Sequence, residues 1–156
     1  VRICLVMAST TELDRVVTNR LAQHAMRYTA GRQAIVTALR AIGGPVTLPE
    51  LLAFSGAVPQ SSAYRNLALM EEAGVVRRLV HGADHAHFEL AEELTEHHHH
   101  LICERCGSVE DFTLDEELEA LLDAAFGRAA MAATATMSSH LIDVFIVCGA
   151  CTDSPS

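Results

Sequence analysis

The stretch HHHHLICERC, residues 97–106, determines how the second half of this chain is organised. Its C-x-x-C pair, Cys103 and Cys106, is repeated near the end of the sequence by Cys148 and Cys151. Two such knuckles supply the four thiolates that structural zinc binds as a tetrahedron. We therefore predict a structural Zn²⁺ that ties the end of a strand to the C-terminal residues. A redox function for the pairs is a weaker interpretation, because there are two pairs and no βαβ pattern surrounds them.

The four histidines of this stretch lead directly into a strand. Alternate side chains of a strand point to opposite faces, so His98 and His100 would face one way and His97 and His99 the other. Each pair can then contribute to a different metal centre. The alternative is a solvated polar run, but histidine-rich tracts are typical of metal binding and this one adjoins a zinc knuckle. Further ligands would come from nearby carboxylates, and His140 is the best isolated histidine.

The first half of the chain has a different pattern, in which apolar residues recur at helical spacing. The predicted helices cover residues 11–26, residues 30–42 after an N-cap at Thr29, a short segment capped by Thr47, and residues from Ser61 or Ser62 to 72. Strands at 75–80 and 87–90 flank the turn 81–84 and make a hairpin. Helices followed by a hairpin describe a winged helix, in which the helix before the wing enters the DNA major groove.

Beyond an acidic linker the pattern predicts a small second domain. It would contain strands at 98–103, 109–112 and 139–147 and a helix at 115–126. Three strands and one helix are few for a stable monomer, so we expect a second copy to complete the sheet. The chain is thus predicted to be α+β. Its parts would be a winged-helix DNA-binding domain at 10–90, a linker at 91–97 and a metal-binding α/β dimerisation domain at 98–152.

The net charge of −9 hides an asymmetry between the two halves. Residues 27–78 carry six arginines against three glutamates, whereas the sequence from Glu89 onward has fourteen acidic residues against Arg105 and Arg128. The first half can approach phosphate while the second collects cations. No apolar run approaches the roughly 18 to 20 residues of a membrane span, so we expect a cytoplasmic protein without a membrane partner. In that compartment paired cysteines favour zinc over disulfides.

Together these motifs resemble the ferric uptake regulator family of bacterial metal-dependent repressors. The resemblance covers about residues 20–151 and rests on S-A-Y-R in the fourth helix, F-E-L closing the hairpin, the histidine run with its C-x-x-C-G, and the final H-x7-C-x-x-C. It implies a homodimeric repressor of metal uptake or homeostasis genes that binds operator DNA. The effector would be Fe²⁺ or Zn²⁺, with Mn²⁺ and Ni²⁺ also open.

The resemblance also assigns ligands. The four paired cysteines match the structural zinc site. A site within the dimerisation domain would use His97, His99, Glu119 and His140, and a sensing site between the domains would use Glu89, His98, His100 and Asp111. Many family members add a histidine from the loop after the second helix, but residues 43–45 are Gly-Gly-Pro here. We expect His87 to replace it, with His81 and His85 as alternatives, and Glu92 or Glu93 as substitutes for Glu89.

For DNA, the resemblance implies that Tyr64 reads a base edge and Arg65 a phosphate. Arg27 and Arg32 match basic positions near the start of the second helix, of which Arg27 could enter the minor groove. Two other functions stay open: a zinc-stabilised interaction module without DNA binding, and a metal-dependent hydrolase. The hydrolase is disfavoured because the sequence has no H-E-x-x-H pattern and no nucleophile motif.

Overall fold

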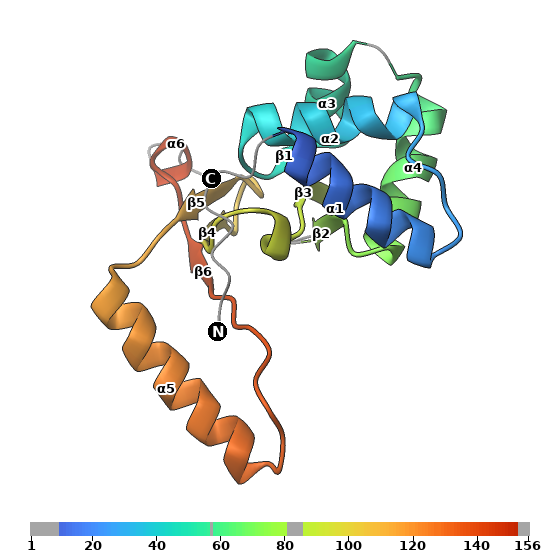
Figure 1. Cartoon of the computed structure of the whole chain (residues 1–156). Coiled ribbons are helices and arrows are strands. Elements are labelled where there is room, and N and C mark those ends of the chain that lie inside the picture. Colours follow the sequence, from blue (N-terminus) through green and yellow to red (C-terminus); the bar gives the residue numbers. More distant parts are fainter. Residues whose placement is uncertain (1–9, 57, 81–85, 153–156) are drawn as a thin grey trace.

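The structure is a computed structural model that describes residues 10–56, 58–80 and 86–152 (Figure 1). The predicted turn at 81–84, the candidate ligands His81 and His85, and Cys4 lie outside these residues. Among the helices of the described ranges, none combines the length and the apolar character that crossing a membrane requires.

The N-terminal unit is a helical bundle with a small sheet. Its elements are α1 (Thr10–Gln23), α2 (Ala30–Ile42), β1 (Val46–Thr47), α3 (Leu48–Ser55), α4 (Gln60–Glu72), β2 (Val76–Val80) and β3 (Ala86–Leu90). The sheet is antiparallel with the order β1-β3-β2. Apolar side chains from all four helices and the sheet pack into one core, with Leu21, Ile35, Leu51, Leu67 and Met70 among the fully buried ones. This arrangement is the predicted winged helix.

Local rules explain most of the helix ends in this unit. Thr47 caps α3 in a capping box with Glu50, and Gly43 ends α2 in the left-handed region at φ 76°. The expected serine cap of α4 is wrong, because the helix begins at Gln60 directly after Pro59, which has the extended backbone of an N-cap. Helix α1 ends at Gln23, before the expected residue 26, and Ala25 then has a φ of 56°.

The C-terminal unit is built on a second three-stranded sheet. Its elements are β4 (His99–Cys103), β5 (Val109–Phe112), α5 (Glu116–Ala132), β6 (Asp143–Ile146) and the single-turn α6 (Gly149–Thr152). The order is β5-β4-β6, with β4 antiparallel to β5 and parallel to β6. A 3₁₀ turn, η1 (Glu92–Leu94), lies in the linker between the units. The α+β class is confirmed.

Two elements of this unit differ from the prediction. The strand expected at 139–147 is only Asp143–Ile146, because its ladder with β4 begins where Asp143 pairs with His100. His140 therefore precedes the strand. Helix α5 extends beyond residue 126 to Ala132, and Figure 1 shows it projecting away from the rest of the molecule. None of its residues is buried.

Candidate metal centres

Three groups of side chains place potential metal ligands together. In each group the four ligand atoms lie within 4.8 Å of one another. We call them the cysteine group (Cys103, Cys106, Cys148, Cys151), the junction group (Glu89, His98, His100, Asp111) and the α5 group (His97, His99, Glu119, His140). The strand alternation explains the division of the histidine run, because His98 and His100 share one face and His97 and His99 share the other.

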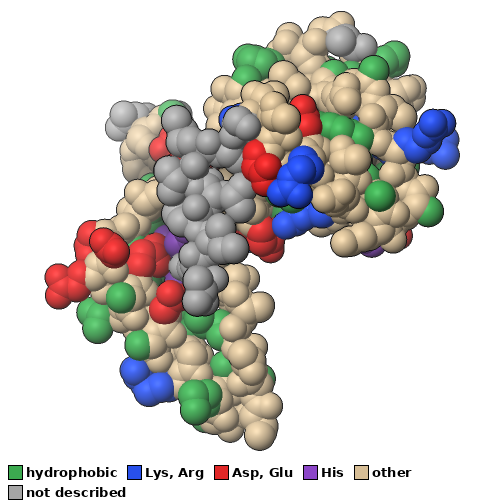
Figure 2. Space-filling view, viewed as in Figure 1, with side chains coloured by type: hydrophobic (Ala, Val, Ile, Leu, Met, Phe, Trp, Pro, Cys, Tyr) green, Lys and Arg blue, Asp and Glu red, His purple; other side chains and the backbone are tan. Residues whose placement is uncertain are grey.

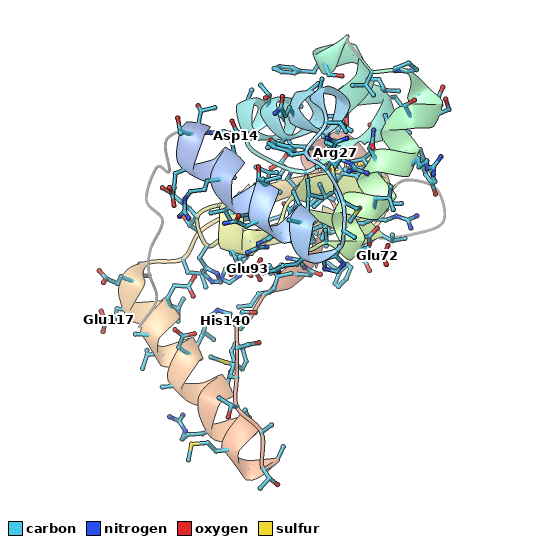
Figure 3. The ribbon with its side chains drawn as sticks, turned by 45° about the vertical axis from the view of Figure 1, so that its right-hand side comes forward. Asp14, Arg27, Glu72, Glu93, Glu117 and His140 are labelled. Carbon is cyan, nitrogen blue, oxygen red and sulfur yellow. The ribbon has the colours of Figure 1, made fainter. Side chains whose placement is uncertain are left out.

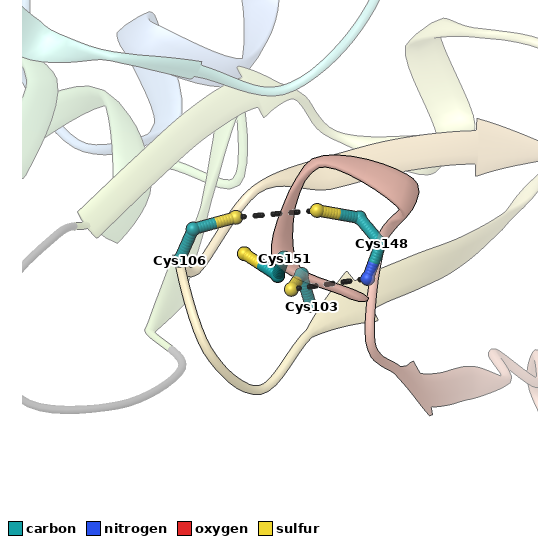
Figure 4. A group of neighbouring side chains, drawn as sticks. All are labelled: Cys103, Cys106, Cys148 and Cys151. Carbon is teal, nitrogen blue, oxygen red and sulfur yellow. Dashed lines mark hydrogen bonds between the residues drawn. The ribbon is translucent and has the colours of Figure 1, made fainter. Parts of the chain in front are cut away.

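The cysteine group joins two turns at one end of the second sheet (Figure 4). The first turn contains Gly107, whose amide donates to the carbonyl of Cys103 at 2.9 Å and whose φ is 71°. The second is α6, which follows β6. The Sγ atoms of Cys106 and Cys148 are 3.7 Å apart, close to the edge of about 3.8 Å that a tetrahedron with Zn–S bonds of about 2.3 Å has.

Backbone amides favour a thiolate in this group. The amides of Cys148 and Cys106 donate to the Cys103 sulfur and lower the pKa of its thiol to about 6. Hydrogen bonding with Cys148 and Cys106 instead raises the pKa of Cys151 to about 12. All four cysteines are free of disulfides. Four convergent thiols, one of them already acidified, fit a structural Zn²⁺, which binds thiolates.

The junction group takes its members from both units. Glu89 lies on β3, in the sheet of the winged helix. His98 directly precedes β4, His100 lies on β4 and Asp111 lies on β5. The Nε2 atoms of His98 and His100 each lie 3.3 Å from a carboxylate oxygen of Glu89. They lie 3.9 Å and 3.8 Å from the oxygens of Asp111. One buried carboxylate of the winged helix therefore faces two imidazoles of the second sheet.

The two imidazoles and two carboxylates of the junction group form a cluster of ion pairs. Burial raises the pKa of Glu89, but hydrogen bonds from His100 and His98 outweigh it and bring the pKa down to about 2. The bond to Glu89 raises the pKa of His98 to about 9. Burial raises the pKa of Asp111. In this state protons on the imidazoles balance the carboxylates, and a divalent cation of the same charge could replace them.

The loop after α2 contributes no ligand, as its sequence predicts. Gly44 is so close to the junction group that a Cβ atom there would lie 3.3 Å from the Asp111 Oδ2. A cavity of about 490 Å³, lined by Gly43 and Gly44 together with Glu89, opens beside the group. The expected substitute, His87, pairs with Thr47 across the wing sheet and is not among the clustered donors. Its position on β3 thus gives the cavity no further ligand.

The α5 group is centred on Glu119. Its two carboxylate oxygens lie 2.9 Å from His99 Nε2 and 3.2 Å from His140 Nε2. Nε2 of His97 lies 3.4 Å from the same carboxylate, is buried and has no hydrogen-bond partner. A buried nitrogen without a hydrogen-bond partner, next to two other imidazoles and a carboxylate, fits the donor set of a divalent cation.

The imidazoles are held from behind by groups that sequence reasoning did not assign. The Nδ1 atoms donate to the carboxylates of Glu92 (from His97), Asp143 (from His100, 3.1 Å) and Asp123 (from His140, 2.9 Å), and to the Glu96 carbonyl (from His98, 2.8 Å). Such contacts orient the ring and keep a proton on Nδ1, so that Nε2, once it has no proton, is the nitrogen whose lone pair can bind a metal. Glu92 and Glu93 were expected as possible ligands in place of Glu89. Glu92 instead contacts His97 and Glu93 contacts Arg20, so neither belongs to the junction group. No local pattern marks these partners, since they meet only in the folded chain.

The predicted DNA-contacting residues fall into two classes. Tyr64 and Arg65 are exposed on α4, with Tyr64 55% exposed, and Arg27 is exposed before α2. Arg32 is buried, and its guanidinium donates to Asn66 Oδ1 at 3.2 Å and to the Arg27 carbonyl. Its assignment to DNA is therefore not supported, because it links α2 to α4. In Figure 2 most of the visible basic side chains lie on the N-terminal unit, while acidic ones gather near the start of α5.

A winged helix joined through a shared ligand group to a sheet with two further ligand groups defines a metal-responsive DNA-binding regulator. The model of the ferric uptake regulator family matches residues 23–140. The chain belongs to this family. Its members among the known relatives are transcriptional regulators, which supports a metal-dependent repressor as the general function of this chain and not an enzyme.

Similar proteins support the assignment at nearly full length. The chain is 30% identical to the ferric uptake regulation protein of Legionella pneumophila, covering 89% of this chain and 88% of that one. It is 30% identical to the peroxide-responsive repressor PerR of Staphylococcus aureus, covering 91% and 93%. A 41% match to the ferric uptake regulation protein of Synechococcus elongatus spans 45% of this chain and about half, 47%, of that relative. The structure of the Helicobacter pylori ferric uptake regulator has the same fold, with a TM-score of 0.70 at 22% identity, covering 96% and 98%.

Proposed function

We propose that this protein represses genes of metal uptake or homeostasis by binding operator DNA as a homodimer in the cytoplasm, with a divalent metal in the junction group as effector. The observation that carries this proposal is the position of Glu89. Its carboxylate belongs to the winged helix, while the three other donors belong to the second unit. A cation bound by all four would hold the two units at one angle.

The repression mechanism follows from the spacing of DNA half-sites. Two recognition helices of a dimer must sit a whole number of helical turns apart to enter successive major grooves. Without the cation, the protonated His98 and His100 hold Glu89 only through hydrogen bonds, and the angle between the units can vary. When the four donors share a cation, the competent angle becomes the dominant one and DNA affinity rises.

The types of donor atom in the junction group limit which divalent metals it can bind. Two imidazoles and two carboxylates suit Fe²⁺ and Zn²⁺, and they also accept Mn²⁺ and Ni²⁺. We favour Fe²⁺ or Zn²⁺ as effector and Zn²⁺ alone for the cysteine group, whose four sulfurs select it. The related structures include one described as a zinc-bound manganese uptake regulator, 26% identical with a TM-score of 0.56. The α5 group is a second divalent site with three imidazoles and one carboxylate.

The exposed apolar face of the C-terminal unit supports the homodimer. Leu121 on α5 is 63% exposed and Phe145 on the edge strand β6 is 56% exposed. An edge strand and a helix with no buried residue offer a surface that a second copy can cover. We expect Leu121→Glu to shift the protein from dimer to monomer in sedimentation velocity, with Glu117→Gln on the same helix as the control. A wild-type monomer at micromolar concentration would contradict the proposal.

The deciding experiment measures DNA affinity against metal. Protein stripped of all but the structural zinc is titrated with Fe²⁺ (anaerobically), Zn²⁺ and Mn²⁺ while its binding to operator DNA is followed by fluorescence anisotropy. The wild type should bind DNA at least tenfold more tightly once metal is added. His98→Ala combined with His100→Ala should remove most of that increase and leave the dimer intact. His24→Ala, which changes an exposed histidine in the turn after α1, is the control.

The outcome that contradicts the assignment is specific. If the double variant keeps the full wild-type increase in operator affinity on addition of metal, the junction group is not the sensing site. If no metal changes the DNA affinity of the wild type, the chain is an interaction module and not a metal-dependent repressor.

A further inference from the structure

The linker reaches the α5 group through a single acidic side chain. Glu92, in the 3₁₀ turn η1, accepts a hydrogen bond from Nδ1 of His97. The two side chains are 19% and 20% exposed, so the contact is largely shielded from water. Because Nδ1 gives its proton to Glu92, the lone pair of His97 lies on Nε2, the buried nitrogen without a partner that faces the α5 group.

The same turn is attached to the winged helix. The amide of Ala91 donates to the carbonyl of Val75 at 3.0 Å. Next to Glu92, Glu93 lies 3.4 Å from the guanidinium of Arg20 on α1. Two adjacent glutamates of one turn therefore point to different units, Glu93 to the winged helix and Glu92 to the α5 group.

Residues of both units surround this turn. A cavity of about 610 Å³ is lined by Arg20, Ala91, Glu92 and Glu93 on one side and by His140 on the other. Figure 3 shows Glu93 and His140 at this junction. The Arg20–Glu93 ion pair and the His97–Glu92 hydrogen bond are the side-chain contacts that join this turn to the winged helix and to the α5 group.

We propose that Glu92 is a positioning residue for His97 that couples the α5 group to the linker, so that a divalent metal bound by the α5 group also restrains the angle between the units. This inference rests on the proposed function for its consequence on DNA. It adds a second site of control: the junction group acts on the angle directly, and the α5 group acts on it through Glu92.

The coupling has a physical cause. If Nε2 of His97 bound a metal, the Nδ1–H group would become more acidic, and His97 would donate that proton more strongly to the Glu92 carboxylate. The stronger bond immobilises Glu92 and with it the turn from 91 to 95. By thermodynamic reciprocity, a linker held in this conformation also binds metal more tightly through the α5 group.

The test isolates the α5 group by placing every variant in the His98→Ala, His100→Ala background. Zn²⁺ or Mn²⁺ is added to protein that retains its structural zinc, and two quantities are measured: metal affinity, by competition with a chelator, and hydrogen exchange of the amides at 91–95. In this background metal should slow exchange at these amides. Glu92→Ala should lose that protection and bind metal about 10- to 100-fold more weakly, the usual cost of removing the partner of a ligating histidine.

Two matched variants separate coupling from simple damage to the turn. Glu93→Ala removes the same charge from the same turn but leaves His97 untouched, so metal affinity and metal-induced protection should persist. Glu92→Gln keeps an acceptor oxygen and should recover part of the affinity. Wild-type metal affinity in Glu92→Ala, equal losses in Glu93→Ala, or no metal binding by the α5 group would each overturn the inference. Each of these readouts is independent of DNA, so failure of the repressor function itself would be seen separately.

Discussion

The two units of this chain are stabilised in opposite ways. Every member of the buried apolar core cluster lies between Leu13 and Leu90, in the winged helix. Among the described residues after Ala91, the buried apolar side chains are Ile102 and Cys103, while His99, His100 and His140 are buried as well. The first unit is held by the hydrophobic effect, whereas the second unit buries few apolar side chains and has polar imidazoles among its buried groups. All of the candidate metal ligands except Glu89 follow the winged helix in the chain, in the part that has little apolar core.

Loss of a zinc ligand should have the largest effect. We expect Cys148→Ser to lose the structural Zn²⁺ and to unfold the C-terminal unit, because apparent binding energies of structural zinc are about 10–16 kcal/mol and folding of such units depends on them. The measurements are zinc content, sedimentation and thermal melting by circular dichroism. The helices of the winged helix should keep their signal. A zinc-free variant that remains a stable dimer would break the contrast between the units.

A core substitution should show the reverse pattern. Leu67 on α4 is fully buried in the winged-helix core. Leu67→Ala should lower the free energy of unfolding of this unit by about 2–5 kcal/mol through lost burial and a cavity. Zinc content and dimerisation should not change. If urea unfolding removes zinc at the same lower midpoint, the two units unfold as one and the comparison must be revised.

The response of the junction group to pH should be intermediate in size. The bond to Glu89 raises the pKa of His98 to about 9, and the pKa of His100 is raised by its carboxylate partners against the effect of burial. In each ring both nitrogens face an acceptor oxygen, so without metal both imidazoles carry two protons, and a metal must displace those on Nε2. Apparent metal affinity should rise about tenfold per pH unit for each proton released, from pH 6 toward about 9. Isothermal titration in buffers of different ionisation enthalpy counts the protons, and a pH-independent affinity would refute this account.

The smallest effect concerns a cation beside the sensing carboxylate. Arg77 is the cross-strand partner of Glu89, and its Nη1 lies 3.9 Å from Glu89 Oε1. Its charge should disfavour a divalent cation in the junction group. Arg77→Ala should therefore bind metal about two- to fivefold more tightly, which corresponds to about 0.5–1 kcal/mol for a partly exposed ion pair. Arg78→Ala, exposed on the same strand, is the control. Weaker metal binding in Arg77→Ala would show that this residue supports the group.

Much of the fold and of the ligand groups could be predicted from local patterns. Apolar spacing located four helices and the hairpin, and the alternation of residues 97–100 separated the two histidine pairs. The predictions that differ from the structure concern residues whose position depends on strand pairing or on contacts with distant elements. His140 was expected on a strand, but the ladder begins at Asp143, and His87 was expected as a ligand, but it is not among the clustered donors. Arg32 matched a DNA-contacting position, yet Asn66 on another helix engages it.

The sequence by itself determined the ligand types, their alternation and the order of the two units, because spacing along a helix or strand dictates which side chains share a face. Only the tertiary structure decided which groups stand behind the ligands: Asp143 behind His100, Asp123 behind His140 and Glu92 behind His97. These carboxylates come from a strand, a helix and the linker, and no local rule relates their positions. Chain folding brings them within hydrogen-bonding distance, and the linker glutamate in particular connects metal binding to the angle between the units.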